Sequence, residues 1–149
     1  MANWETRTRV KGQPEHVLEV LTDPDAARRW SPIGFELEQI DGDRLRSGTH
    51  AKLTGKLAGK GVSFDVHVVK ASDGQLELHA TGPIEMDVLY DAIASDEGTE
   101  VVASVAVRSR GGLIGRVLSS ATDALLAGGA LSVAVQGVAR EVERSAAAA

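Results

Sequence analysis

The sequence predicts an α+β domain in which an antiparallel sheet packs on a long C-terminal helix, and three observations carry this prediction. Residues 34–109 alternate apolar and polar side chains with a period close to two, between short turns rich in glycine and aspartate. Residues 113–144 contain no proline and have an apolar middle. Two short helix signals precede the alternating region. A period of two is typical of half-buried strands, and a long proline-free apolar segment is typical of a buried helix.

The N-terminal elements follow from alternation and from two prolines. Residues 4–11 place Trp4 on one side of a strand and Glu5 on the other. Pro14 then stands at the first position of a short helix, where proline is favoured. Asp23-Pro24 repeats this start signal for a second short helix through Trp30. The sequence therefore predicts one strand and two short helices before the main sheet.

Turns divide the alternating region into six further strands. Turn residues lie at 41–43, 59–61, 72–74 and 96–98, and Gly82-Pro83 makes a further break. Short strands joined by tight turns favour a meander of antiparallel hairpins. Since one face is apolar and the other polar, we expect the sheet to be covered on one side only.

The predicted cover is one helix from Leu113 to about Arg144. Its middle, residues 124–131, is apolar all round, and such helices are usually buried. Gly128 and Gly129 each cost about 1 kcal/mol relative to alanine inside a helix. We therefore expect a close approach or an open space at these glycines.

Composition bounds the class of protein. The chain has 149 residues, which is about one domain, so we expect a single domain over 1–149. It has no cysteine, which excludes disulfides and cysteine metal sites and favours a cytoplasmic location. The net charge of −5 and the lack of a basic block argue against nucleic-acid binding. Residues 124–135, the longest charge-free apolar stretch, are too short to span a bilayer, and residues 1–5 lack the apolar core of a signal peptide.

A short motif connects this order of elements to a known superfamily. Leu21-Thr22-Asp23-Pro24, followed by Trp30, resembles the signature after the first helix of START-like (SRPBCC) proteins. That group includes polyketide cyclase/dehydrase and lipid-transport proteins, coenzyme Q-binding proteins and Bet v 1-like pollen-allergen proteins. Gly48-Thr49 and Gly82-Pro83 are similar to bacterial members, and the resemblance extends from Trp4 to Arg144.

The resemblance implies a helix-grip fold. In this fold a curved seven-stranded antiparallel sheet wraps around a long C-terminal helix, two short helices follow the first strand, and a cavity between sheet and helix takes hydrophobic ligands. The group has no universal catalytic residues, so none is carried over to this chain.

The inward strand positions define the candidate site. They carry no Asp, Glu, His, Lys or Arg, whereas general acid–base catalysis needs a titratable group within reach of the substrate. This assignment depends on register, because one bulge would exchange the faces of a strand. No catalytic residue is therefore named. The predicted ligand-binding residues are Trp30, Phe35, Leu53, Phe64, Leu78, Met86, Tyr90 and Leu125.

Two motifs receive an ordinary structural interpretation. His67 and His79 lie at outward-facing positions of neighbouring predicted strands, and with Asp65 they could hold a metal ion. No metal-ligand spacing supports this, so solvated histidines are favoured and no metal or cofactor is predicted. Residues 55–61 resemble a phosphate loop but lack its spacing and its Ser or Thr, and are predicted to be a hairpin turn.

We expect a binding protein for a hydrophobic small molecule of lipid, isoprenoid or polyketide-like type, held by few polar contacts. The first alternative is a polyketide cyclase/dehydratase-type enzyme that uses the same cavity. The second is a protein-interaction module with a closed cavity, and the small residues at 124–131 could form a homodimer contact. An ionisable residue in the interior would favour the enzyme, and an apolar open interior would favour the carrier.

Overall fold

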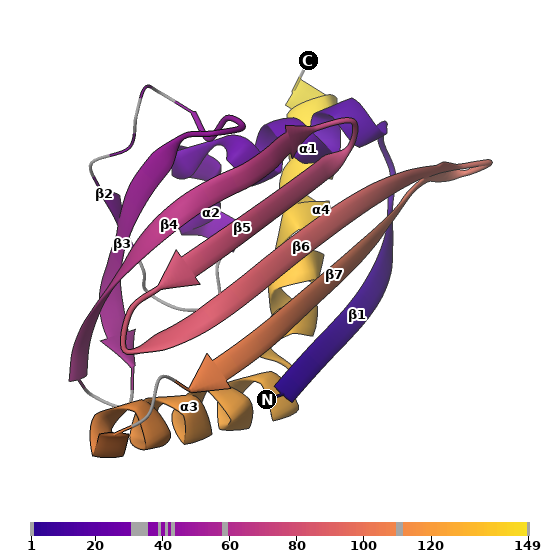
Figure 1. The fold of residues 1–149 in the computed structure, drawn as a ribbon. Helices are drawn as coiled ribbons and strands as arrows, with labels where there is room; N and C mark the ends of the chain where they lie inside the picture. Colours follow the sequence, from indigo (N-terminus) through magenta and orange to yellow (C-terminus); the bar gives the residue numbers. More distant parts are fainter. Residues whose placement is uncertain are drawn as a thin grey trace.

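A computed structural model of the chain describes residues 2–30, 36–38, 40, 42, 44–57, 60–109 and 112–148. The elements in chain order are β1 (Ala2–Val10), α1 (Pro14–Thr22), α2 (Pro24–Trp30), β2 (Glu36–Glu38), β3 (His50–Leu57), β4 (Lys60–Ser72), β5 (Gln75–Thr81), β6 (Ile84–Ser95), β7 (Gly98–Ser109), α3 (Gly112–Ala127) and α4 (Ala130–Ala148) (Figure 1). This order matches the predicted one: one strand, two short helices, six strands and a helical C-terminal region.

The seven strands form one antiparallel sheet in the order β1-β7-β6-β5-β4-β3-β2. From β2 to β7 the strands follow one another as a meander, while β1 pairs with β7 over its whole length. Helices α1 and α2 therefore carry the chain from one edge of the sheet to the other. This arrangement confirms the predicted α+β helix-grip architecture.

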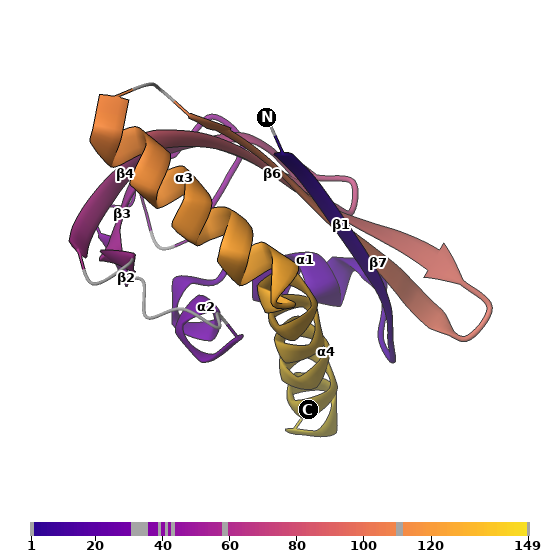
Figure 2. The same ribbon diagram turned by 90° about the horizontal axis from the view of Figure 1, so that it is seen from below.

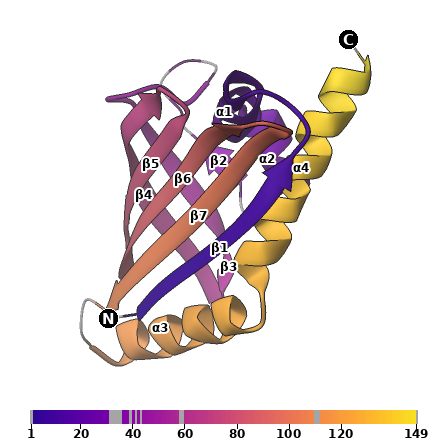
Figure 3. The same ribbon diagram turned by 90° about the vertical axis from the view of Figure 1, so that its right-hand side faces the viewer.

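The sheet curves into an arch, and all four helices lie on its concave side (Figure 2). Helix α3 crosses one end of the arch, α1 and α2 lie toward the other end, and α4 runs beside β1 (Figure 3). The hydrophobic core lies between the sheet and these helices, and includes Val17, Phe64, Val101 and Val138. The concave side is therefore the face that the predicted pocket would use.

Strand alternation places side chains on the two faces as predicted. On β4, Phe64 is buried and Asp65 is exposed. A bulge between Val68 and Lys70 inserts Val69, which is 46% exposed. If side chains alternated regularly after Val68, Lys70 would point toward the concave face. The bulge shifts the alternation by one residue, so that Lys70 points outward and Ala71 inward.

The predicted single C-terminal helix over 113–144 is wrong, because the chain breaks between α3 and α4. Gly129 has a φ of +96°, a left-handed conformation that favours glycine, and its N–H bonds the carbonyl oxygen of Leu126 at 3.1 Å. The two helices are bent by 58°. The glycine pair ends one helix and lets the next begin in a new direction. Among the described residues, no single helix is long and apolar enough to cross a membrane.

Candidate functional site

The concave face of the sheet is apolar. Among the strand residues whose side chains the structure describes, the concave positions hold no Asp, Glu, His, Lys or Arg. The polar groups there are hydroxyls, such as those of Thr6 and Tyr90. The strands alone therefore offer no acid–base pair, and this part of the sequence prediction is confirmed.

The centre of this face is less buried than its surroundings. Leu78 and Val88 are register partners on β5 and β6, and both keep solvent-accessible surface although the helices lie on that side. Met86 and Leu53 are likewise only partly buried. Phe64, in contrast, is 1% exposed. Inward-facing apolar side chains in the middle of the sheet are therefore only partly covered by the helices.

Trp30 and Tyr90 meet at the edge of this region. Their ring centroids are 6.0 Å apart in an edge-to-face arrangement, although about 60 residues of sequence separate them. The Trp30 Nε1 atom is buried and has no hydrogen-bond partner. Burial also raises the pKa of the Tyr90 hydroxyl, so this group stays neutral. A buried indole N–H without an acceptor is uncommon and needs an explanation such as a bound water or ligand.

Contacts with α4 hold Trp30 in place. A Cβ atom added at Gly137 would lie 2.7 Å from the Trp30 carbonyl oxygen, so only glycine permits this approach. Next to it, Arg29 Nε donates to Glu141 Oε2 at 3.0 Å, and Arg144 also bonds the Glu141 carboxylate. Burial acts to raise the pKa of Glu141, but the hydrogen bonds and charges of the two arginines outweigh it and lower the pKa. The carboxylate is thus charged and ties α2 to α4.

The predicted ligand-binding residues do not all lie together. Trp30, Leu53, Leu78 and Met86 are partly buried and pack against the core, and Phe64 and Tyr90 belong to it. Leu125 lies on α3 with 40% of its surface exposed, outside the core cluster. Phe35 lies outside the described residues. Their contact with a ligand stays a prediction.

Sequence reasoning missed Asp123 because it considered only the strands for interior charge. Asp123 lies on α3, beside the buried Thr122, and its Oδ1 atom is buried without a hydrogen-bond partner. A carboxylate between two small residues carries no local signal of burial, which arises from the packing of α3 across the end of the arch.

The convex face of the sheet is polar and carries a row of histidines. His50 and His67 are register partners, with His50 Nε2 and His67 Nδ1 2.9 Å apart. His67 is in turn the register partner of His79, whose Nδ1 lies 2.6 Å from Asp87 Oδ1. The hydrogen bond from His79, followed by that from Arg108, lowers the pKa of Asp87. The predicted proximity of His67 and His79 is confirmed, and His50 joins them.

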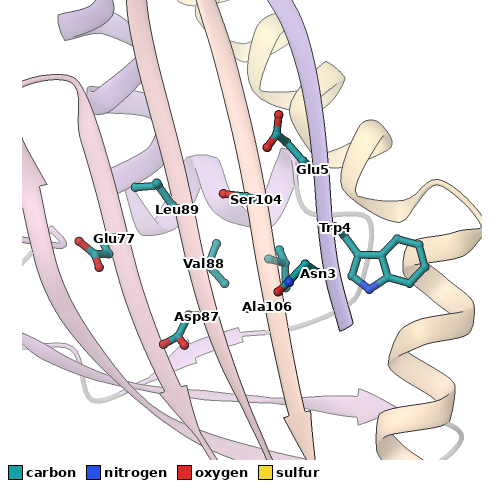
Figure 4. A pocket seen from close by; sticks show the side chains of 10 residues that line it. Asn3, Trp4, Glu5, Glu77, Asp87, Val88, Leu89, Ser104 and Ala106 are labelled. Atoms are coloured by element: carbon teal, nitrogen blue, oxygen red, sulfur yellow. The ribbon is translucent and has the colours of Figure 1, made fainter. Parts of the chain in front are cut away.

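The described residues line two further hollows, one on the convex face and one at the α1 end of the concave side. One, of about 300 Å³, opens on the convex face beside β1, β6 and β7, where Glu5, Glu77 and Asp87 line it, and Trp4 points away toward the C-terminal helices (Figure 4). The other, of about 600 Å³, lies between α1 and the β4–β5 turn. Within the described parts of the chain, no group of three or more His, Asp or Glu side chains is arranged to hold a metal ion.

Comparison with known proteins defines the fold. No protein-family model matches the sequence, and no curated protein matches it either. Solved structures do match over nearly the whole chain. The protein TTHA0849 from Thermus thermophilus has a TM-score of 0.70 at 14% identity, and the match covers 97% of this chain and 99% of that one.

Two further structures share the same arrangement. The Zhui aromatase/cyclase from Streptomyces sp. R1128 has a TM-score of 0.69 at 18% identity, with 96% of this chain and 94% of that one covered. The protein Ara h 8.0201 has a TM-score of 0.66 at 13% identity, with coverages of 96% and 98%. These structures bear out the resemblance that the residues around Asp23 indicated. The chain therefore has the same helix-grip fold as these structures.

Proposed function

We propose that this domain binds a hydrophobic small molecule on the concave face of its sheet, beneath α3 and α4. The observation that carries the proposal is the buried Trp30 Nε1 atom, which has no acceptor, at the margin of an apolar face whose central side chains are only partly buried. A ligand with an apolar body and one acceptor oxygen would satisfy both features. Lipids with a carbonyl or hydroxyl group, oxygenated isoprenoids and polyketide-like aromatics meet this description.

The energetics favour an apolar ligand with a single polar handle. Apolar surface removed from water contributes about 25 cal/mol per Å², so the body of the ligand supplies most of the affinity. A hydrogen bond to Trp30 adds about 0.5–1.5 kcal/mol, and orients the molecule. Because the concave strand positions hold no charge, a charged headgroup would have to remain at the rim.

The two tryptophans permit a direct test. The chain contains only Trp4 and Trp30, so Trp4→Phe leaves Trp30 as the sole indole and Trp30→Phe leaves Trp4. We would titrate each variant with palmitate, farnesol and the anthraquinone emodin while following indole fluorescence. The proposal predicts a saturable change in the Trp4→Phe variant with at least one probe, and a much smaller change in the Trp30→Phe variant.

Affinity and stability together separate a ligand contact from a packing role. Trp30→Phe removes an N–H that has no partner but also part of the ring that packs against Tyr90, so we expect a loss of stability of the free chain of about 1–2 kcal/mol, while affinity, measured by calorimetry on the folded variant, falls about tenfold. Equal affinity in both variants for every probe that binds would contradict the proposed contact. Binding that is lost in both variants alike would place the ligand elsewhere.

A second candidate function is supported by Asp123. Its buried and unpartnered Oδ1 atom is the kind of group that general acid–base catalysis uses, and the proposed ligands include reactive polyketide chains. A cyclase or dehydratase would use this carboxylate to move a proton of the bound chain. Asp123→Asn keeps the shape of the side chain and removes its basicity.

The carrier and the enzyme differ in the response to this substitution. If the protein is an enzyme, the wild-type chain should turn over a poly-β-ketone substrate mimic, and Asp123→Asn should lower this turnover by about 100-fold or more while affinity is kept. If the protein is a carrier, both the wild-type chain and the Asp123→Asn variant should bind the mimic without turnover. Turnover that survives in Asp123→Asn would exclude this carboxylate as the acid or base.

A further inference from the structure

The convex face holds a pair of imidazoles that the proposed binding function does not use. His50 on β3 and His67 on β4 are antiparallel register partners. Their Nε2 and Nδ1 atoms are 2.9 Å apart, and the ring centroids are separated by 4.6 Å at an interplanar angle of 60°. His50 is exposed and His67 is partly exposed, so both can be reached from solvent. The strand ladder fixes the spacing of the two side chains.

We propose that His50 and His67 form a surface binding site for a divalent transition metal ion, with copper(II) preferred. Neutral imidazole is the commonest metal ligand in proteins, and it can bind through either ring nitrogen. In this structure the two facing nitrogens are joined by a hydrogen bond of 2.9 Å, in which one ring donates to the other. A metal ion would replace the proton between them and be chelated from the two neighbouring strands, and water molecules would complete the coordination. Each ring would carry its proton on the nitrogen that faces away from the metal.

The separation of the two nitrogens favours one coordination geometry. With metal–nitrogen bonds of about 2.0–2.1 Å, nitrogens 2.9 Å apart subtend an angle of about 90° at the metal. Ligands at a tetrahedral angle would be about 3.4 Å apart, as zinc sites require. Right angles are those of tetragonal copper(II) and nickel(II) sites, and copper(II) also stands highest in the general affinity order. A small rotation of the exposed rings directs both lone pairs at the ion.

The neighbouring groups define the extent of the site. Asp65 lies two residues before His67 on the same face and favours a cation, while its register partner Lys52 opposes it. His79, on the other side of His67, is held by Asp87 at 2.6 Å, and this bond engages its Nδ1 atom. Among the described residues, the proposed site is therefore built on two histidines. The net charge of −5 makes the chain as a whole attractive to a cation.

The test uses the tag-free full chain and copper(II) chloride alone, followed by isothermal titration calorimetry and electron paramagnetic resonance. We expect one copper ion per chain with a Kd of about 10 µM or tighter, and a tetragonal spectrum with two coupled nitrogens. His50→Gln and His67→Gln should each weaken copper binding at least about tenfold. Nickel(II) and zinc(II) should bind more weakly.

Two matched variants make the assignment falsifiable. His16→Gln, on the exposed side of α1, should leave the copper affinity unchanged, and so should His79→Gln. Wild-type affinity in His50→Gln or His67→Gln would overturn the site. A loss in His79→Gln as large as that in His67→Gln would show a three-histidine site and overturn the two-histidine assignment. Circular dichroism on every variant confirms that the sheet is intact.

Discussion

The two faces of one sheet differ in every property that decides function. On the concave face, Phe64 and Tyr90 are buried, and a buried indole N–H lies beside them without an acceptor. On the convex face, His67 and Asp87 have partners and remain open to solvent. The same strands, β1 and β3 to β7, contribute side chains to both faces. Alternation alone therefore gives one sheet an apolar face and a polar face.

The difference also shows where stability and function reside. Buried apolar side chains stabilise the arch, whereas exposed ion pairs contribute little. The proposed ligand site depends on which apolar side chains the packing leaves partly exposed, and the proposed metal site on which polar groups the register brings together. Substitutions on the two faces should therefore have effects of different size.

The largest contrast lies between two neighbouring residues on β4. Phe64→Ala should destabilise the chain by about 3–5 kcal/mol, because Phe64 is 1% exposed and its loss leaves a cavity. Asp65→Ala, on the convex face, should change stability by no more than about 0.5 kcal/mol. Urea denaturation of both variants measures the difference. Similar losses in the two variants would mean that the two faces are not separated as described.

The approach of α2 to α4 gives the next contrast. Gly137→Ala should cost about 1–3 kcal/mol, since its Cβ would lie 2.7 Å from the Trp30 carbonyl oxygen and α2 would have to move. The Trp30 emission maximum should shift with it, which the Trp4→Phe background would report. In the control, Gly61→Ala, no other atom lies within 4 Å of the new Cβ. A wild-type emission maximum in Gly137→Ala would show that this contact does not position Trp30.

The Glu141 carboxylate predicts a pH-dependent stability. Its pKa is lowered in the folded chain from the ordinary value of 4.5, so its contribution is present above pH 4.5 and is lost as the pH falls through the folded-state value. Glu141→Gln should cost about 1–2 kcal/mol at pH 7, a range reduced because Arg29 is half exposed. The gap between the two chains should narrow below pH 4.5. A gap that stays constant down to about pH 2 would contradict the ion pairs.

On the convex face, the Asp87 carboxylate predicts a similar but smaller dependence of stability on pH. The pKa of Asp87 is also lowered, through His79 and then Arg108, so its contribution is present above the ordinary value of 3.8 and is lost as the pH falls through the folded-state value. Asp87 and Arg108 are 44% and 36% exposed, and water and salt screen them more strongly. Asp87→Asn should therefore lose less stability at pH 7 than Glu141→Gln, and added salt should reduce that loss. The reverse order would overturn the comparison.

Much of the fold could be predicted because its signals are local. The alternation around Phe64, the turn at Asp73-Gly74 and the prolines at 14 and 24 each specify nearby backbone. The break at Gly129 was missed, because helix propensity treats two glycines as a cost and does not say which way the chain turns. That choice depends on how α3 packs across the end of the arch.

The site could be predicted only in part. The alternation of apolar and polar residues along the strands indicated an inner face without charged side chains, and the structure confirms it for the described strand residues. The pairing of Trp30 with Tyr90, the burial of the Asp123 carboxylate and the position of Leu125 on the exposed side of α3 depend on contacts between elements far apart in the sequence. His50 joined the histidine row through the β3–β4 register, which hairpin signals alone do not specify.

The most direct test of ligand binding is native mass spectrometry of the purified chain, compared with the same sample after denaturation. The chain should carry an extra mass of a few hundred daltons that denaturation releases, either as purified or after incubation with palmitate, farnesol and emodin. The released compound should be apolar and contain at least one acceptor oxygen. A bare chain under all of these conditions would contradict binding on the concave face, and would favour an interaction module with a closed interior.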